Sequence, residues 1–94
     1  MDKELVNKII HKHGTVAQSM IAMEECSELI QAISKCLRSK ELIPTETREH
    51  LIEEMADVMI CLEQLMAMYS ITDEELISWI ERKELRLKKR EGII

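Results

Sequence analysis

Apolar residues recur every three or four positions along nearly the whole chain, which is the spacing of α-helices with one buried face. The pattern is interrupted at His13-Gly14-Thr15, at residues 39–44 and at Ser70-Ile71. It predicts four helices. The first is capped by Asp2 and ends near Lys12, and the second runs from Thr15 to Leu37 or Arg38. The third has Thr45 as N-cap candidate and ends near Met68, and the fourth runs from a capping box at residues 72–75 to about Arg90. Four helices joined by short connections predict an all-α fold, an antiparallel four-helix bundle.

The composition agrees with a helical protein. The 94 residues include only 2 Gly and 1 Pro, and aromatic residues make up 2%, so turns are few and many short strands are not expected. The length corresponds to one domain, residues 1–94. No apolar run is long enough to cross a bilayer and no signal peptide is recognisable, so we expect a soluble, cytoplasmic protein.

The net charge is −5, from 13 basic and 18 acidic residues. An acidic chain is poorly suited to a nucleic-acid polymer, whose phosphates are bound by Lys and Arg. The 3 cysteines (Cys26, Cys36 and Cys61) form no CxxC pair. We therefore expect them to be buried small apolar residues without a disulfide, and with the histidines they lack the spacing of a zinc site.

Two of the predicted helices carry acids on their apolar faces. Glu25 and Glu28 belong to such a face in residues 15–38; Glu54 belongs to one in residues 45–68, and Asp57 lies beside it. Buried carboxylates are costly unless a cation accompanies them. No Lys or Arg lies within one turn of these four residues on the same helix faces. These acids therefore point to a bound cation, although ordinary solvated helix acids remain an alternative.

The register of an antiparallel hairpin aligns these acids in pairs. At the helical rise, Glu28 and Glu54 lie about 15 Å and about 13.5 Å from the turn, and Glu25 and Asp57 lie about 20 Å and about 18 Å from it. We expect Glu28 to face Glu54 and Glu25 to face Asp57, with Glu24 as a candidate fifth carboxylate. Oxygen-only donors favour Mg²⁺, with Mn²⁺ as a possible substitute. The absence of a Glu-x-x-His pattern argues against a di-iron bundle.

The acids also form two motifs. Residues 24–28 read EExxE and residues 54–57 read ExxD, each followed by an apolar continuation. Over about residues 11–90 the chain resembles the MazG-like nucleoside triphosphate pyrophosphohydrolases, members of the all-α NTP pyrophosphatase superfamily. Either motif alone is weak, because Glu is common in helices, whereas the pair at this separation is fairly specific.

The resemblance implies an enzyme, a Mg²⁺-dependent hydrolase that cuts nucleoside or deoxynucleoside triphosphates between the α and β phosphates and serves to clean the nucleotide pool. It makes Glu25, Glu28, Glu54 and Asp57 the metal ligands, and Glu24 a catalytic residue that orients water. Weaker assignments to substrate binding are Lys35, Lys83 and Arg86 for the phosphates, and Gln18 for a base edge.

Two other functions stay open at this point. One is the related phosphoribosyl-ATP pyrophosphohydrolase of histidine synthesis, although its usual Gly- and Lys-containing lead into the first motif is replaced here by residues 20–23. The other is a non-catalytic helical interaction module.

The first and fourth predicted helices are apolar on more than one side. We therefore expect a homodimer or a dimer of dimers, with substrate pockets completed across the interface.

Overall fold

The computed structural model describes residues 1–93, which form four α-helices and no strand. The helices are α1 (Lys3–His13), α2 (Thr15–Arg38), α3 (Thr45–Met68) and α4 (Asp73–Arg90). The predicted all-α fold with four helices is confirmed. None of these helices combines the length and the apolar character that crossing a membrane requires; the cytoplasmic location stays a prediction.

The helix ends follow from local chemistry. Asp2 caps α1 by accepting a hydrogen bond from the Leu5 amide at 3.0 Å. Gly14 takes a φ of 87°, which suits glycine, and turns the chain directly from α1 into α2. Thr72 and Glu75 form the predicted capping box at the start of α4.

The prediction of Thr45 as the N-cap of α3 is wrong. Pro44 occupies that position, and it makes no side-chain capping bond because proline has no side-chain acceptor. Thr45 is instead the first residue of the helix. The helix therefore begins one residue earlier than an N-cap at Thr45 predicts, and the predicted capping bond is absent.

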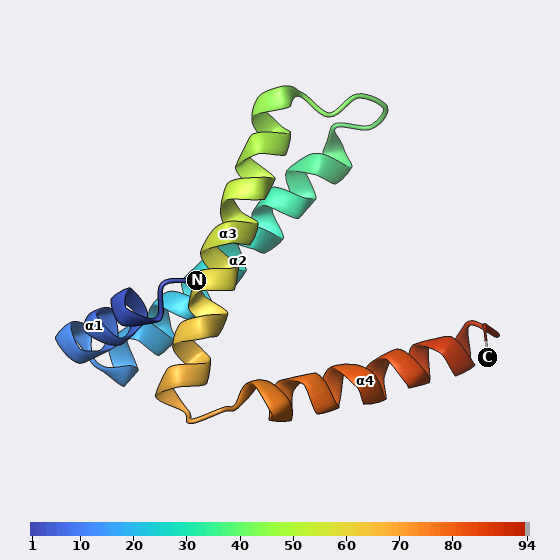
Figure 1. The fold of residues 1–94 in the computed structure, drawn as a ribbon. Helices are drawn as coiled ribbons and strands as arrows, with labels where there is room; N and C mark the ends of the chain where they lie inside the picture. Colours follow the sequence, from blue (N-terminus) through green and yellow to red (C-terminus); the bar gives the residue numbers. More distant parts are fainter. Residues whose placement is uncertain (94) are drawn as a thin grey trace.

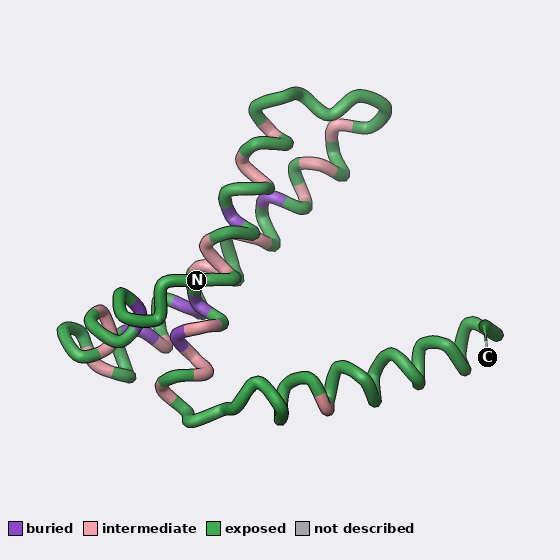
Figure 2. Tube along the Cα trace, in the orientation of Figure 1, coloured by how far each residue is buried: buried purple, intermediate pink, exposed green. Residues whose placement is uncertain are grey.

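The core of the chain is the antiparallel hairpin of α2 and α3, against which α1 packs (Figure 1). Buried residues follow the contact between these helices (Figure 2): they are Val6, Gln18, Ala22, Ala32, Glu54, Cys61 and Gln64. The amide of Gln18 donates to the side-chain oxygen of Gln64 at 2.9 Å, which satisfies part of this polar content. The hairpin is thus held by small apolar residues and by paired amides.

Helix α4 projects away from the other three helices (Figure 1) and, within residues 1–93, packs against none of them. Nearly all of its residues are exposed (Figure 2). Three helices of one chain therefore pack together while the fourth extends as an arm. Most of the stability of a helix in a protein comes from packing of its apolar face, and α4 has no such packing within residues 1–93.

The three cysteines have different environments. All are free, and only Cys61 is buried, whereas Cys36 is half-buried and Cys26 is exposed. The expectation of buried thiols is thus wrong for Cys26, which is exposed.

We predict that Ala32→Leu destabilises the chain. Ala32 is 1% exposed between α2 and α3, so the added atoms must push the two helices apart, at a cost of about 1–3 kcal/mol. Urea unfolding followed by circular dichroism measures the change. Ala17→Leu, at an exposed position of the same helix, is the control and stays within about 0.5 kcal/mol of the wild type; equal effects of both substitutions would contradict the prediction.

Candidate metal centre

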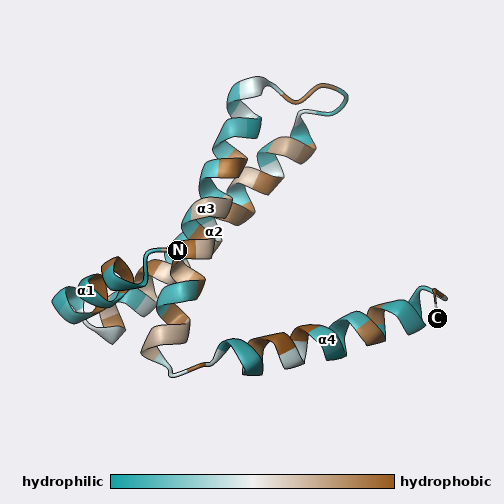
Figure 3. Cartoon of the chain, in the orientation of Figure 1, coloured by the Kyte–Doolittle hydropathy of each residue, from teal (hydrophilic) through white to brown (hydrophobic). Residues whose placement is uncertain are grey.

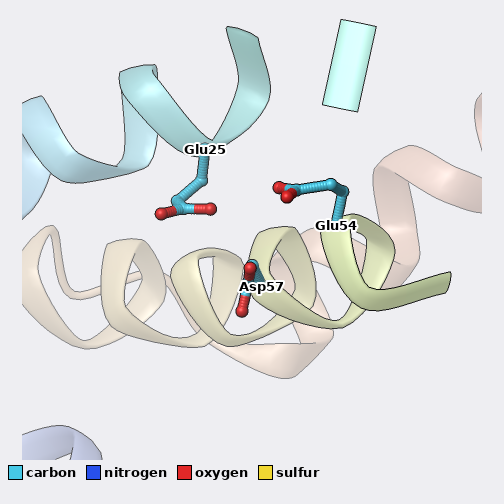
Figure 4. Close-up of side chains that lie close together, drawn as sticks. All are labelled: Glu25, Glu54 and Asp57. Carbon is cyan, nitrogen blue, oxygen red and sulfur yellow. The ribbon is translucent and has the colours of Figure 1, made fainter. Parts of the chain in front are cut away.

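Three carboxylates converge between α2 and α3. Glu25 comes from α2, and Glu54 and Asp57 come from α3, where a separation of three residues places them on one face of the helix. Glu25 and Glu54 extend toward one another between the helices, and Asp57 lies beside them on α3 (Figure 4). Each offers one oxygen, and these oxygens all lie within 4.8 Å of one another. The convergence expected from the hairpin register is therefore present for these three residues.

The cluster is enclosed and poorly compensated. Glu54 is only 5% exposed and Glu25 is half-buried. One oxygen of each, Oε2, is buried and has no hydrogen-bond partner. Leaving a buried carboxylate oxygen without a partner is costly, and a cation between the three carboxylates would remove that cost. The donor set is all oxygen, which fits a hard divalent cation.

Burial and mutual repulsion change the acidity of the cluster. Loss of hydration raises the pKa of Glu25, and the nearby charges of Glu28, Asp57 and Glu54 raise it further. The pKa of Glu54 is raised in the same way, first by burial and then by Glu28 and Asp57, with partial relief from His50. Burial, together with the charge of Glu25, also raises the pKa of the Cys61 thiol. Without a cation the cluster therefore resists full ionisation.

Glu28 lies at the open side of this cluster. It is exposed, and its charge raises the pKa of both Glu25 and Glu54. With Gln31 and Lys35 of α2 and with His50 and Glu54 of α3 it lines a hollow of about 270 Å³. The predicted phosphate ligand Lys35 thus lies in the same hollow as two of the predicted metal ligands.

His50 and Gln31 were not predicted as part of this site. His50 is half-buried, and its Nε2 lies 3.9 Å from Oε1 of Glu54. Its position one turn before Glu54, and that of Gln31 one turn after Glu28, were the available signals. Both residues are common in solvated helix faces, so spacing alone did not distinguish them.

The remaining predicted site residues lie outside the cluster. Glu24 is exposed and is not one of the three clustered carboxylates. Gln18 is buried, and its amide is already bonded to Gln64. Lys83 and Arg86 are exposed on α4, which does not approach α2 or α3 of its own chain. Their roles stay predictions.

The raised pKa values of Glu25 and Glu54 predict how the stability of metal-free protein depends on pH. A carboxyl whose pKa is higher in the folded state than in the unfolded state stabilises the fold below the unfolded pKa, and this contribution is lost as pH rises through the folded value. Urea unfolding in EDTA should therefore show that Glu54→Gln, which cannot ionise, gains stability over the wild type at pH 7.5 but gains less at pH 5.

Glu49→Gln is the matched control, because Glu49 is exposed in the first turns of the same helix. We expect the stability difference between Glu49→Gln and the wild type to be equal at the two pH values. If Glu54→Gln behaved in the same way, the repulsion described for the cluster would be absent.

Of three comparisons with known proteins, one finds a match. No curated protein and no solved structure matches the chain. The model of the MazG nucleotide pyrophosphohydrolase domain matches residues 12–90, a span that includes all three clustered carboxylates and nearly the whole chain. The acidic cluster between α2 and α3 thus lies inside a matched domain of the same all-helical class, and the chain belongs to the MazG nucleotide pyrophosphohydrolase family.

Proposed function

We propose that the protein hydrolyses nucleoside or deoxynucleoside triphosphates at the α–β phosphoanhydride bond, in a Mg²⁺-dependent reaction that releases a nucleoside monophosphate and pyrophosphate. The observation that carries this proposal is the cluster of Glu25, Glu54 and Asp57, with two buried oxygens that have no partner, inside a MazG domain. Removal of unwanted nucleotides from the cellular pool is the role that fits this reaction in a single domain.

The proposed metal ligands are Glu25, Glu28, Glu54 and Asp57. Mg²⁺, or Mn²⁺ in its place, would neutralise the triphosphate and activate a water molecule for attack on phosphorus. The chain itself has a net charge of −5, so without a cation its acidic cluster would repel the substrate. The carboxylates therefore both hold the cation and make binding of the triphosphate depend on it.

Phosphate binding is proposed for Lys35, which shares a hollow with Glu28 and Glu54. Lys83 and Arg86 could reach a phosphate only at the site of another subunit, because α4 extends away from its own hairpin. We therefore propose a homodimer or a dimer of dimers in which α4 of one copy contributes these cations to the pocket of its neighbour.

Two proposed residues act beside the metal ligands. Glu24, exposed next to Glu25, is proposed to orient water. Gln18 is proposed to read a base edge, for which its hydrogen bond to Gln64 would have to break. Gln18 therefore carries less of the proposal than Lys35 does.

Loss of one metal-binding carboxylate should abolish most of the activity. We expect Asp57→Asn and Glu28→Ala to lower the turnover number by at least about 10²-fold, the usual scale for losing a group that stabilises transition-state charge. Release of pyrophosphate from a panel of nucleoside triphosphates and phosphoribosyl-ATP, in the presence of Mg²⁺, is the measurement. The wild type should yield monophosphate and pyrophosphate, and no diphosphate.

Glu49→Ala is the control, since Glu49 lies on the same helix as Asp57 but in its solvated first turns, and it should keep wild-type turnover. Formation of diphosphate and free phosphate, or full activity of Glu28→Ala, would overturn the proposed mechanism. Activity on phosphoribosyl-ATP alone would identify the protein as the phosphoribosyl-ATP pyrophosphohydrolase of histidine synthesis. Absence of activity on every nucleotide tested would favour the non-catalytic interaction module.

Mg²⁺ should stabilise the fold, because the proposed site exists only when α2 and α3 are paired. Mass action gives about 2.7 kcal/mol at a hundredfold excess of the ion over its dissociation constant. We expect the melting temperature to rise across millimolar MgCl₂ and to return to its starting value in EDTA. The melting temperature of Asp57→Asn should rise less with MgCl₂ than that of the wild type. If neither MgCl₂ nor EDTA changed the melting temperature of the wild type, the proposed metal site would be refuted.

A further inference from the structure

Within residues 1–93, no large apolar side chain is buried between α2 and α3. The buried apolar residues of these two helices are Ala22, Ala32 and Cys61. Small side chains let helices approach closely, but the alignment of packed helices is fixed by large side chains that interlock. Hydrophobic and hydrophilic segments also alternate along both helices (Figure 3). A shift of one turn would therefore place apolar residues against apolar residues again.

The loop between the two helices does not fix their alignment either. Residues 39–44 connect Arg38 to Thr45, and a loop of this length can extend to about 20 Å. One helical turn is about 5.4 Å long. The loop can therefore follow a shift of α3 along α2 by one turn in either direction.

The acids do not favour the observed alignment in metal-free protein. Their three nearest carboxylate oxygens lie within 4.8 Å of one another, so the charges repel. Oε2 of Glu25 and Oε2 of Glu54 are also buried without a partner. A shift of α3 by one turn would place Glu54 or Cys61, rather than Asp57, opposite Glu25 and would spread the three acids apart. Another contact must therefore hold the acids together before a cation binds.

The amide pair of Gln18 and Gln64 is such a contact. The two residues are 3% and 5% exposed, and Nε2 of Gln18 donates to Oε1 of Gln64 at 2.9 Å. Among the side-chain hydrogen bonds of residues 1–93, no other joins two buried groups. A shift of one turn would break this bond and leave two buried amides unpaired, which is costly.

The amide pair lies at the same separation from the acids on both helices. Gln18 precedes Glu25 by seven residues, and Gln64 follows Asp57 by seven residues. Seven residues make two helical turns and return to nearly the same face of the helix. In an antiparallel hairpin, the alignment that pairs Gln18 with Gln64 is therefore the one that sets Glu25 opposite Asp57.

We propose that Gln18 and Gln64 are positioning residues, whose hydrogen bond selects the alignment of α2 and α3 that brings the three acids together. A buried polar group can select one arrangement of packed helices at a cost in stability. The cost is present here, because Oε1 of Gln18 has no partner. The alignment belongs to the metal-free chain and depends on no step of the hydrolysis. Only its effect on cation binding rests on the proposed function.

The positioning role differs from the reading of a base edge. A nucleobase could take the Gln18 amide only if the bond to Gln64 broke, so the side chain cannot serve both roles at once. Positioning requires Gln64 as much as Gln18, whereas base reading by Gln18 does not require Gln64.

Replacement of both amides by apolar side chains of similar shape tests the proposal. We expect the double variant Gln18→Met, Gln64→Met to unfold at the same urea concentration as the wild type or at a higher one, because no buried amide is left unpaired. Gln18→Met alone should unfold at a lower urea concentration, because it leaves Gln64 buried without its partner.

The alignment can be measured at Tyr69, the only tyrosine of the chain. Its hydroxyl lies 2.8 Å from the hydroxyl of Ser19, so nuclear Overhauser contacts between its ring and Ser19 report the observed alignment in EDTA. We expect these contacts in the wild type and their loss in the double variant. Tyr69→Phe is the control, because it removes an exposed hydrogen bond between the same two helices. The ring at position 69 should then keep its contacts with Ser19.

Cation binding gives a second measurement. The electron paramagnetic resonance signal of free Mn²⁺ reports how tightly each variant binds the ion. We expect the double variant to bind Mn²⁺ at least about tenfold more weakly than the wild type, the usual scale for losing a residue that orients metal ligands. Tyr69→Phe should bind Mn²⁺ as the wild type does. A merely structural role for the amides predicts that stability and Mn²⁺ affinity fall together.

A double variant that keeps the contacts between Tyr69 and Ser19 would overturn the proposal, and so would one that loses them but binds Mn²⁺ like the wild type. If the double variant does not fold, Gln18→Leu with Gln64→Leu repeats the test. Failure of both pairs to fold would assign the amides to stability and not to alignment. Absence of Mn²⁺ binding by the wild type would contradict the proposed metal centre, and the Tyr69 contacts would still decide the alignment.

Discussion

The cost of holding carboxylates between two packed helices is the constraint on which the rest of this structure depends. Glu54 is buried at the contact of α2 and α3, and one of its oxygens has no partner. An apolar residue at this position would pack without that cost. A chain that has Glu54 beside Glu25 and Asp57 gives up stability at this contact, and the hairpin must be stable enough to tolerate the loss.

The hairpin meets that requirement in a particular way. Ala22 and Ala32 allow α2 and α3 to approach closely. The buried Gln18 amide donates to the side-chain oxygen of buried Gln64, while the side-chain oxygen of Gln18 is left without a partner. The acids then lie between these contacts, on a backbone that is regular on both sides. A site carried by helices is positioned more precisely than one carried by loops, which suits chemistry that requires several oxygens to surround one ion.

The single chain buries little of its apolar surface. Within residues 1–93 only four apolar residues are buried, whereas the hairpin and α4 expose many. Glu28, Gln31 and Lys35 of α2 line a hollow with His50 and Glu54 of α3, and large apolar residues such as Met23, Ile30 and Leu62 are exposed elsewhere on the hairpin. The basic second half of α4 makes no contact with the hairpin of its own chain.

The sequence by itself determined the four helices, because their spacing, caps and breaks are local properties of the chain. The register of an antiparallel hairpin also predicted that Glu25 faces Asp57 and that Glu28 faces Glu54. Of these four acids, Glu25, Glu54 and Asp57 come together in the structure. Only the tertiary structure decided how far each acid is buried, why Gln18 bonds to Gln64, and that His50 lies beside Glu54. The position of α4 could not be predicted from the sequence for the same reason. An amphipathic pattern shows that a helix has an apolar side, but it does not show which surface packs against that side, because this depends on contacts between residues far apart in the sequence.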